Sequence, residues 1–210
     1  MTKIYYDAEF TGLHRNSTFI SLGMVSESGN TFYAEFTDYD RYYVTDWIQD
    51  NVIANLQLPT TKDCPQFYTS NIPTGVTQSV GTSDDNRGYL LKWLENEANG
   101  GQLQFIVDCY AYDWMLLVDL LTNGKTALDM PEYIHYIPLD LSTMLWMSGE
   151  DPDISREQFA LNPWTGVTDI HLAGPKHNAL FDARVIKLCY GRINYELRAI
   201  VTDNPRLPFN

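Results

Sequence analysis

The stretch FISLGMVSESGNTFYAEF, residues Phe19–Phe36, decides the fold that we predict for this chain. Its two halves, Phe19–Val25 and Thr31–Phe36, are β-prone runs, and the turn-forming residues Ser28-Gly29-Asn30 separate them. A strand, a turn and a second strand in this order are typical of a β-hairpin. Another β-prone run, Lys3–Asp7, precedes the hairpin. We therefore expect the chain to begin with three antiparallel strands.

Helical patterns alternate with further strands after the hairpin. Between Val44 and Leu58, apolar residues recur at helical spacing, and Asp46 is the predicted N-cap. The later predicted elements are helix Arg87–Ala98, strand Leu103–Val107, helix Asp113–Leu121, a weaker strand Tyr133–Ile137, helix Leu139–Met147 and a helix over about Asn178–Ile193. This alternation predicts an α/β fold in which helices flank a mixed sheet, with the antiparallel strands first and parallel strands later.

Two segments have no sustained apolar periodicity. Residues 59–86 are rich in Pro, Thr, Ser, Asn and Gly, and residues 148–176 are interrupted by Pro and Gly. We expect both to be long loops within a single domain that spans residues 1–210, and we expect Asp84-Asp85 to be solvated loop charges. Because long loops near a site are often functional, these two are the expected source of substrate preference.

Composition excludes several classes of protein. The 210 residues are 44% hydrophobic and 13% aromatic, which is too apolar for a largely disordered chain, and the pattern is not that of a coiled coil or collagen. Apolar runs such as Trp114–Val118 fall far short of the roughly 20 residues of a membrane-spanning helix. The first residues, MTKIYYD, lack the apolar region of a secretory signal, and three scattered cysteines form no disulfide framework. We expect a cytoplasmic protein that does not bind membranes.

The charge is acidic but unevenly distributed. With 14 Lys and Arg against 27 Asp and Glu, the net charge is −13, which argues against coating a polyanion by bulk attraction. Residues 176–210 nevertheless contain six basic and three acidic residues, a net charge of +3, which leaves −16 on the remainder. Two interpretations stay open for this segment, namely chance variation on a solvated helix face or a phosphate-contacting surface.

The first strand ends in two carboxylates, Asp7 and Glu9. Because side chains alternate along a strand, residues two apart project from the same face. Such a pair is a ligand set for a hard cation such as Mg²⁺. The alternative is that two acidic residues simply end a strand at the surface.

A histidine and an aspartate occur together near the start of the last predicted helix. His177 precedes Asp182 by five residues, which on a regular helix is a turn of roughly 140°. The two side chains share a site only if His177 lies in the loop and Asp182 in the helix, and Gly174-Pro175 makes that break plausible. A neutral imidazole suits a general base. The alternatives are a helix cap or a surface histidine.

Three motifs together resemble those of a known enzyme family. The string Asp7-Ala8-Glu9-Phe10-Thr11-Gly12-Leu13, followed by Ile20-Ser21-Leu22-Gly23, resembles the first motif of the DnaQ-like (RNase T-like) 3′-to-5′ exonucleases. His177-Asn178-Ala179-Leu180-Phe181-Asp182-Ala183 resembles the third motif of the DEDDh subclass, and Tyr112-Asp113 fits the second. The resemblance covers about residues 4–193 and implies a ribonuclease H-like fold.

The second motif departs from the family pattern. Members often carry an Asn about four residues before the Asp, and Asp108 and Cys109 occupy that neighbourhood here. Asp113 and Asp108 are therefore both candidates for the acid of this motif. We prefer Asp113, because it follows an aromatic residue at the start of a predicted helix, whereas Asp108 ends a predicted strand.

The resemblance implies a hydrolase that uses two metal ions, Mg²⁺ or Mn²⁺. The residues that would hold them are Asp7, Glu9, Asp113 and Asp182. His177 would deprotonate the attacking water, releasing a nucleoside 5′-monophosphate from a single-stranded 3′ end. The implied pocket for the terminal nucleotide is formed by Phe10, Thr11, Gly12 and Leu13. Lys176 and Arg184 are candidates for phosphate contacts, or are ordinary surface residues.

We expect RNA to be preferred over single-stranded DNA as the substrate. The Asp-x-Glu-Phe form of the first motif resembles bacterial and phage-type exoribonucleases, and no polymerase domain is evident. The alternatives are a proofreading-like exonuclease for single-stranded DNA, a non-catalytic binding module that keeps the fold, and an acidic scaffold whose motif matches are accidental. Members of the family are often homodimers, although no pattern in this sequence identifies an interface.

Overall fold

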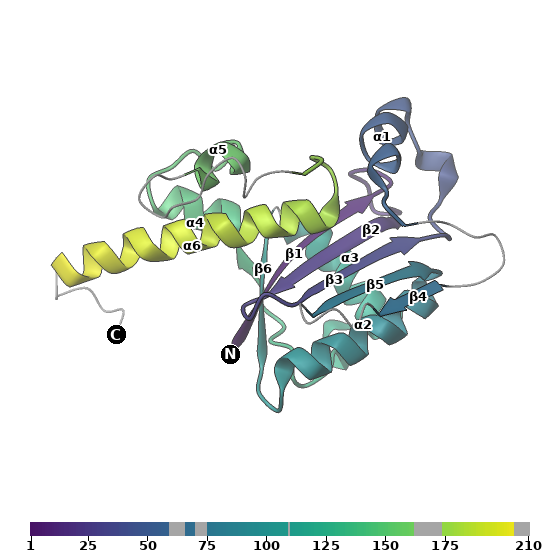
Figure 1. Cartoon of the computed structure of the whole chain (residues 1–210), viewed down its shortest axis with the longest axis horizontal. Helices are drawn as coiled ribbons and strands as arrows, with labels where there is room; N and C mark the ends of the chain where they lie inside the picture. Colours follow the sequence, from purple (N-terminus) through teal and green to yellow (C-terminus); the bar gives the residue numbers. More distant parts are fainter. Residues whose placement is uncertain (59–65, 70–74, 109, 162–173, 204–210) are drawn as a thin grey trace.

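The computed structural model is a mixed α/β fold in which helices cover both faces of one twisted sheet (Figure 1). It describes residues 1–58, 66–69, 75–108, 110–161 and 174–203. No helix in these ranges is both long and apolar enough to cross a membrane.

The sheet has seven strands in the order β4-β5-β3-β2-β1-β6-β7. Strands β1 (Thr2–Phe10), β2 (Phe19–Ser26) and β3 (Thr31–Phe36) form an antiparallel meander, as predicted. Strand β6 (Leu103–Val107) pairs in parallel with β1, and the short β7 (Leu139–Asp140) pairs in parallel with β6. The expected change from antiparallel to parallel pairing is therefore confirmed.

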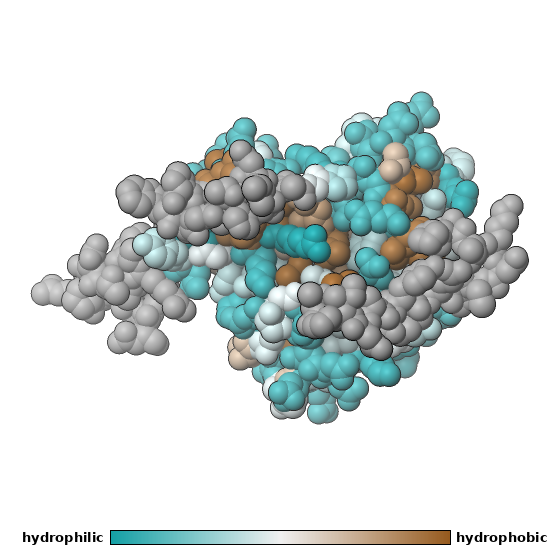
Figure 2. Space-filling model, viewed as in Figure 1, coloured by the Kyte–Doolittle hydropathy of each residue, from teal (hydrophilic) through white to brown (hydrophobic). Residues whose placement is uncertain are grey.

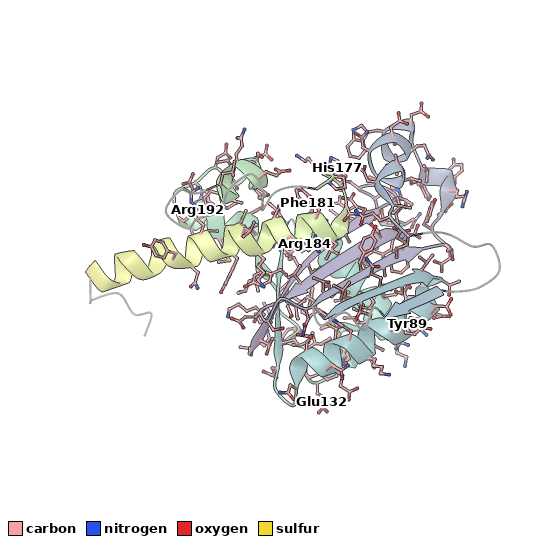
Figure 3. The ribbon with its side chains drawn as sticks, in the orientation of Figure 1. Tyr89, Glu132, His177, Phe181, Arg184 and Arg192 are labelled. Atoms are coloured by element: carbon pink, nitrogen blue, oxygen red, sulfur yellow. The ribbon has the colours of Figure 1, made fainter. Side chains whose placement is uncertain are left out.

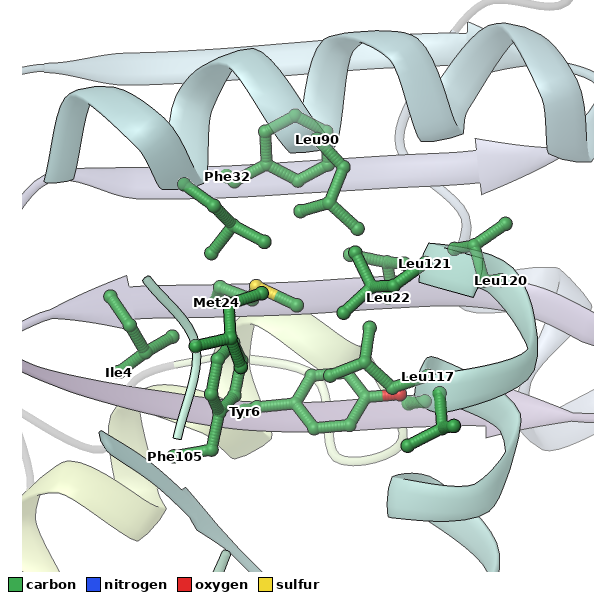
Figure 4. Close-up of a cluster of buried hydrophobic side chains, with 14 of the residues drawn as sticks. Ile4, Tyr6, Leu22, Met24, Phe32, Leu90, Phe105, Leu117, Leu120 and Leu121 are labelled. Carbon is green, nitrogen blue, oxygen red and sulfur yellow. The ribbon is translucent and has the colours of Figure 1, made fainter. Parts of the chain in front are cut away.

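Alternating side chains of β1 divide the core into two layers. Ile4, Tyr6 and Ala8 pack in the layer of α2 (Ser83–Ala98) and α3 (Tyr110–Thr122), part of which is drawn in Figure 4. Tyr5 packs in the opposite layer, against which lie α4 (Leu141–Met147), α5 (Arg156–Ala160) and α6 (Ala179–Asp203). Because Asp7 and Glu9 share the parity of Tyr5, the strand directs them to the α6 side.

The helix predicted between Val44 and Leu58 is shorter than expected. Helix α1 covers Asp46–Asn51, between the 3₁₀ turns η1 (Arg41–Tyr43) and η2 (Ile53–Asn55). The N-cap is Thr45, whose hydroxyl accepts the N–H of Ile48 at 3.2 Å, so Asp46 is not the cap. Trp47 is 55% exposed rather than part of the core. Hydrophobic side chains gather beside α1 on the face seen in Figure 2.

The segment predicted as a loop at residues 59–86 contains two strands and the start of a helix. Strand β5 (Val76–Gly81) pairs in parallel with β3, and β4 (Gln66–Thr69) pairs with β5. The sequence VTQSVG has no continuous apolar run, so its strand character comes from non-local backbone pairing. Helix α2 begins at Ser83 because Thr82 and Asp85 form a capping box, so Asp85 is not a solvated loop charge. Residues 59–65 and 70–74 lie outside the described ranges.

Other boundaries also differ from the prediction. The segment predicted as a loop at 148–176 contains α5, capped by Ser155, while residues 162–173 lie outside the described chain. The predicted strand Tyr133–Ile137 is reduced to one bridge between Leu103 and Ile134. The predicted helix at Leu139–Met147 divides into β7 and α4. Strand β6 has the predicted bounds, whereas α3 begins three residues early and α6 continues to Asp203.

The first turn of α6 lies directly on the sheet at Gly23 of β2. A Cβ placed on Gly23 would overlap backbone atoms of Ala179 and Leu180. In the β1–β2 ladder, Gly23 is the partner of Asp7. The missing side chain therefore lets the start of α6 approach the strand position that carries Asp7.

Replacing Gly23 with Ala is expected to lower the free energy of unfolding by about 1–3 kcal/mol or more, because the new methyl group meets backbone that cannot move aside cheaply. The matched control is Gly88→Ala. Gly88 is exposed within α2, and a Cβ added there would have no atom within 4 Å. Gly88→Ala should therefore raise the free energy of unfolding by about 1 kcal/mol, because Ala has the higher helix propensity. Urea unfolding measures both changes, and equal stabilities for the two variants would contradict the close contact.

Candidate metal centre

One cavity of about 450 Å³ brings together side chains from four distant parts of the sequence, one of which is the segment at the start of α5. Strand β1, helix α3 and the start of α6 each contribute to its wall. The predicted catalytic residues that line it are Asp7, Glu9, Asp113, His177 and Asp182. In Figure 3, His177 lies at the start of α6, above the ends of the strands.

Asp113 is held against β1 by two hydrogen bonds. Its Oδ1 accepts the backbone N–H of Ala8 at 3.0 Å, and the hydroxyl of Tyr6 donates to its main-chain carbonyl at 3.2 Å. The side chain is 6% exposed. These contacts fix the first turn of α3 beside the two carboxylates of β1.

Asp108 lines the same cavity, but its carboxylate is already paired. Arg156 donates through Nε to Oδ2 at 2.6 Å and through Nη2 to Oδ1 at 2.9 Å, and the Ser142 hydroxyl donates to Oδ1 at 3.0 Å. This bidentate pair ties the start of α5 to the end of β6. Within the described chain, no basic side chain forms an ion pair with Asp113. The geometry favours Asp113 over Asp108 as an acid available for a cation.

The turn before α6 has the break that the spacing required. His177 has a φ of 62°, in the left-handed region, and precedes the helix. Asn178 caps α6, because its Oδ1 accepts the N–H of Phe181 at 3.2 Å. Asp182 lies in the first helical turn, where the backbone N–H of His177 acts to lower the pKa of its carboxylate, although burial raises that pKa overall. Both side chains therefore reach one cavity.

The tightest grouping consists of Glu9, His177 and Asp182. Each offers a ligand atom, and these atoms all lie within 4.8 Å of one another. His177 Nδ1 lies 3.9 Å from Glu9 Oε1. Asp7 and Asp113 line the same cavity outside this grouping.

Burial and mutual repulsion disfavour the charged forms of these acids. Burial, followed by the charges of Asp182, Asp113 and Glu9, raises the pKa of Asp7 well above its usual value. Burial is also the main reason that the pKa values of Glu9 and Asp113 rise to about 8 and that of Asp182 to about 7. Burial and the nearby Lys176 lower the pKa of His177, which keeps its imidazole neutral near pH 7. A bound cation would relieve this repulsion.

The chain matches no protein-family model and no curated protein. Within the described residues, the cavity combines clustered acids that have no Lys or Arg ion-pair partner with a neutral histidine, which makes it a candidate functional site on physical grounds.

An apolar pocket of about 670 Å³ adjoins the acid-lined cavity, and the two share Ala8, Glu9 and Phe10. All four residues predicted to contact the terminal nucleotide line this pocket, namely Phe10, Thr11, Gly12 and Leu13. Sequence reasoning missed the opposite wall, which includes Tyr42, Tyr43 and Trp47. The sequence feature that could have identified this wall is the cluster of aromatic residues before and within α1. The Trp47 ring meets the His177 ring edge-on, with centroids 5.0 Å apart.

The two predicted phosphate contacts are placed differently. Lys176 lines the acid-lined cavity, and its Nζ lies 3.6 Å from Oε1 of Glu157, another residue of the cavity wall that sequence reasoning missed. Arg184 is exposed and lines neither cavity. It follows Asp182 by two residues, a rotation of roughly 200° around α6. The structure does not bring Arg184 to the site (Figure 3).

The raised pKa values predict that the metal-free protein loses stability as the pH rises. Glu9, Asp113 and Asp182 keep protons up to about pH 7–8 when folded, but lose them near pH 4 when unfolded. Between these pH values, the folded state therefore binds more protons than the unfolded state. The contribution of these groups to the free energy of unfolding is fully present below pH 4 and is lost as the pH rises through 7–8. Thermal unfolding in EDTA should show Tm falling from pH 5 to pH 8, and Mg²⁺ should restore it.

Asp7→Asn tests the cause of this effect. Removing the charge that faces the other acids should raise Tm at pH 8 in EDTA, by about 2–4 °C for each 1 kcal/mol of repulsion relieved. Asp50→Asn, at an exposed position on α1, is the control and should leave Tm unchanged. A pH-independent Tm for the metal-free protein would contradict the repulsion.

Proposed function

We propose that this protein is a metal-dependent 3′-to-5′ exonuclease of the DEDDh type that acts on single-stranded 3′ ends, with RNA preferred over DNA. The observation that carries this proposal is that four carboxylates and one histidine, from sequence motifs far apart, line one cavity beside an apolar pocket. The antiparallel meander followed by parallel strands supports the ribonuclease H-like fold that the resemblance implies. Strands β4 and β5 lie at one edge of the sheet, beyond this meander.

The donor set fits a hard divalent cation. Carboxylate oxygens are the ligands that Mg²⁺ and Mn²⁺ prefer, and the acids of the cavity have raised pKa values in the absence of such a charge. The residues that would hold the metal are Asp7, Glu9, Asp113 and Asp182. When bound, the ions would neutralise the charge that develops on the phosphoryl oxygens.

His177 is suited to accept a proton from the attacking water. Its lowered pKa leaves the imidazole neutral, which is the form required of a general base. Its Nδ1 lies 3.9 Å from Glu9 Oε1, and its ring packs against Trp47 with the ring centroids 5.0 Å apart.

The apolar pocket is suited to the terminal nucleotide. Its volume of about 670 Å³ lies within the usual range of ligand pockets, about 300–1,000 Å³. Aromatic side chains on two sides offer stacking surfaces for a base. Gly12, at φ 135°, brings bare backbone to the pocket wall, and the 72% exposed Leu13 lies at its rim. A site that grips one terminal nucleotide is compatible with an overall charge of −13, since it needs no extended basic surface.

Incubation with 5′-labelled single-stranded RNA and DNA tests the proposal. With Mg²⁺ or Mn²⁺, we expect products that shorten stepwise from the 3′ end, with RNA degraded faster, and no shortening in EDTA. Asp113→Asn should abolish activity because it removes a ligand. Asp119→Asn changes an exposed acid on the same helix and should retain activity. Shortening in EDTA, or an active Asp113→Asn protein, would rule out the proposal, while faster degradation of DNA would reverse the substrate preference.

His177→Ala should lower kcat by about 10²- to 10⁴-fold at saturating metal, because the general base is lost. In the parent protein, the rate should rise with pH to a plateau, and the midpoint of the rise should lie below the ordinary histidine pKa of about 6.5. The variant should lack this rise. His135→Ala, at a half-buried histidine that lines neither cavity, is the control. Identical pH profiles for His177→Ala and the parent would contradict the role.

A further inference from the structure

The side chain and carbonyl of Asn55 contact both neighbours of His177. Asn55 Nδ2 donates to the main-chain carbonyl of Lys176 at 2.9 Å, and Asn178 Nδ2 donates to the main-chain carbonyl of Asn55 at 3.3 Å. The residues immediately before and after His177 are thus both tied to one residue that lies more than a hundred positions earlier.

The turn that carries His177 needs such support. A φ of 62° is unfavourable for a residue with a Cβ and persists when surrounding contacts determine it. Asn178 is 3% exposed and also donates to the Tyr33 hydroxyl at 3.1 Å. The bonds to Asn55 and Tyr33 therefore hold a strained turn from two directions.

Asn55 belongs to the segment that forms one wall of the apolar pocket. Trp47, Ile48 and Val52 of this segment line the pocket, and η2 follows directly and ends at Asn55. Beyond η2 the segment is held again, because Glu35 accepts the backbone N–H groups of Gln57 at 2.6 Å and Leu58 at 3.0 Å. Glu35 is 2% exposed. The pocket wall and the support of the His177 turn are thus one fixed piece of chain.

We propose that Asn55 is a positioning residue that joins the aromatic wall of the nucleotide pocket to the His177 turn. A nucleotide against Trp47 and the general base at His177 are then aligned through the same short segment. This inference rests on the proposed exonuclease function and adds a residue outside the three motifs.

Asn55→Ala and Asn55→Asp test this role through kinetics. Both remove the donor to the Lys176 carbonyl, and Asn55→Asp keeps the size of the side chain. We expect kcat to fall by about 10- to 100-fold, because a small displacement of a catalytic group lowers the rate by about this factor. KM for a short oligonucleotide should stay within about twofold of the parent value. Asn51→Ala is the matched control, since Asn51 lies one turn earlier and its amide donates to the Trp47 carbonyl within its own segment, at 2.9 Å.

A second measurement needs no activity. In EDTA, the imidazole NMR signals of His177, assigned with His177→Ala, should shift or broaden in both Asn55 variants and remain unchanged in Asn51→Ala. If the parent protein cleaves neither RNA nor DNA but these signals respond as expected, the proposed function fails and the positioning role stands. Unchanged signals and kcat in both Asn55 variants would overturn the role. The positioning role would also be overturned if, in both variants, the decrease in kcat were fully accounted for by a smaller fraction of folded protein.

Discussion

The contact between the first turn of α6 and Gly23 is the constraint on which the rest of the structure depends. Gly23 pairs with Asp7 across the β1–β2 ladder, and backbone of Ala179 and Leu180 occupies the space that a side chain would fill. Because the helix approaches so closely, His177 and Asp182 reach the carboxylates at the end of β1. A larger residue at position 23 would push the third motif away from the first.

The same close approach concentrates negative charge in a partly buried cavity. The folded chain tolerates this because burial raises the pKa values of the acids, so that some remain protonated without metal. Asp108 differs from the other acids, because its carboxylate forms a bidentate ion pair with Arg156, and this pair attaches α5 to the end of β6. The cavity therefore combines a structural ion pair with acids that lack a cation partner in the described chain.

Much of the fold was predictable, because its patterns are local. The hairpin Phe19–Phe36 and strand β6 are rich in apolar and aromatic residues and are bounded by turn residues, and both lie where expected. Strand β5 was not predictable from its polar sequence, because pairing with β3 makes it a strand. The start of α2 carried a readable signal in its capping box, Thr82 to Asp85. Local signals therefore explain why these strands were predicted correctly, and non-local pairing explains why β5 was missed.

The sequence by itself determined which chemical groups are present and how they are ordered along the strands and helices, because alternation and helical periodicity are properties of short segments. It indicated that Asp7 and Glu9 share a face, and that His177 and Asp182 could share a site only if His177 precedes the helix of Asp182. Only the tertiary structure decided that Arg156 pairs with Asp108, that Trp47 faces His177, and that Asn55 supports the histidine turn. These are contacts between residues far apart in the chain, and they depend on how α1, α5 and α6 pack on the sheet, which no local pattern specifies.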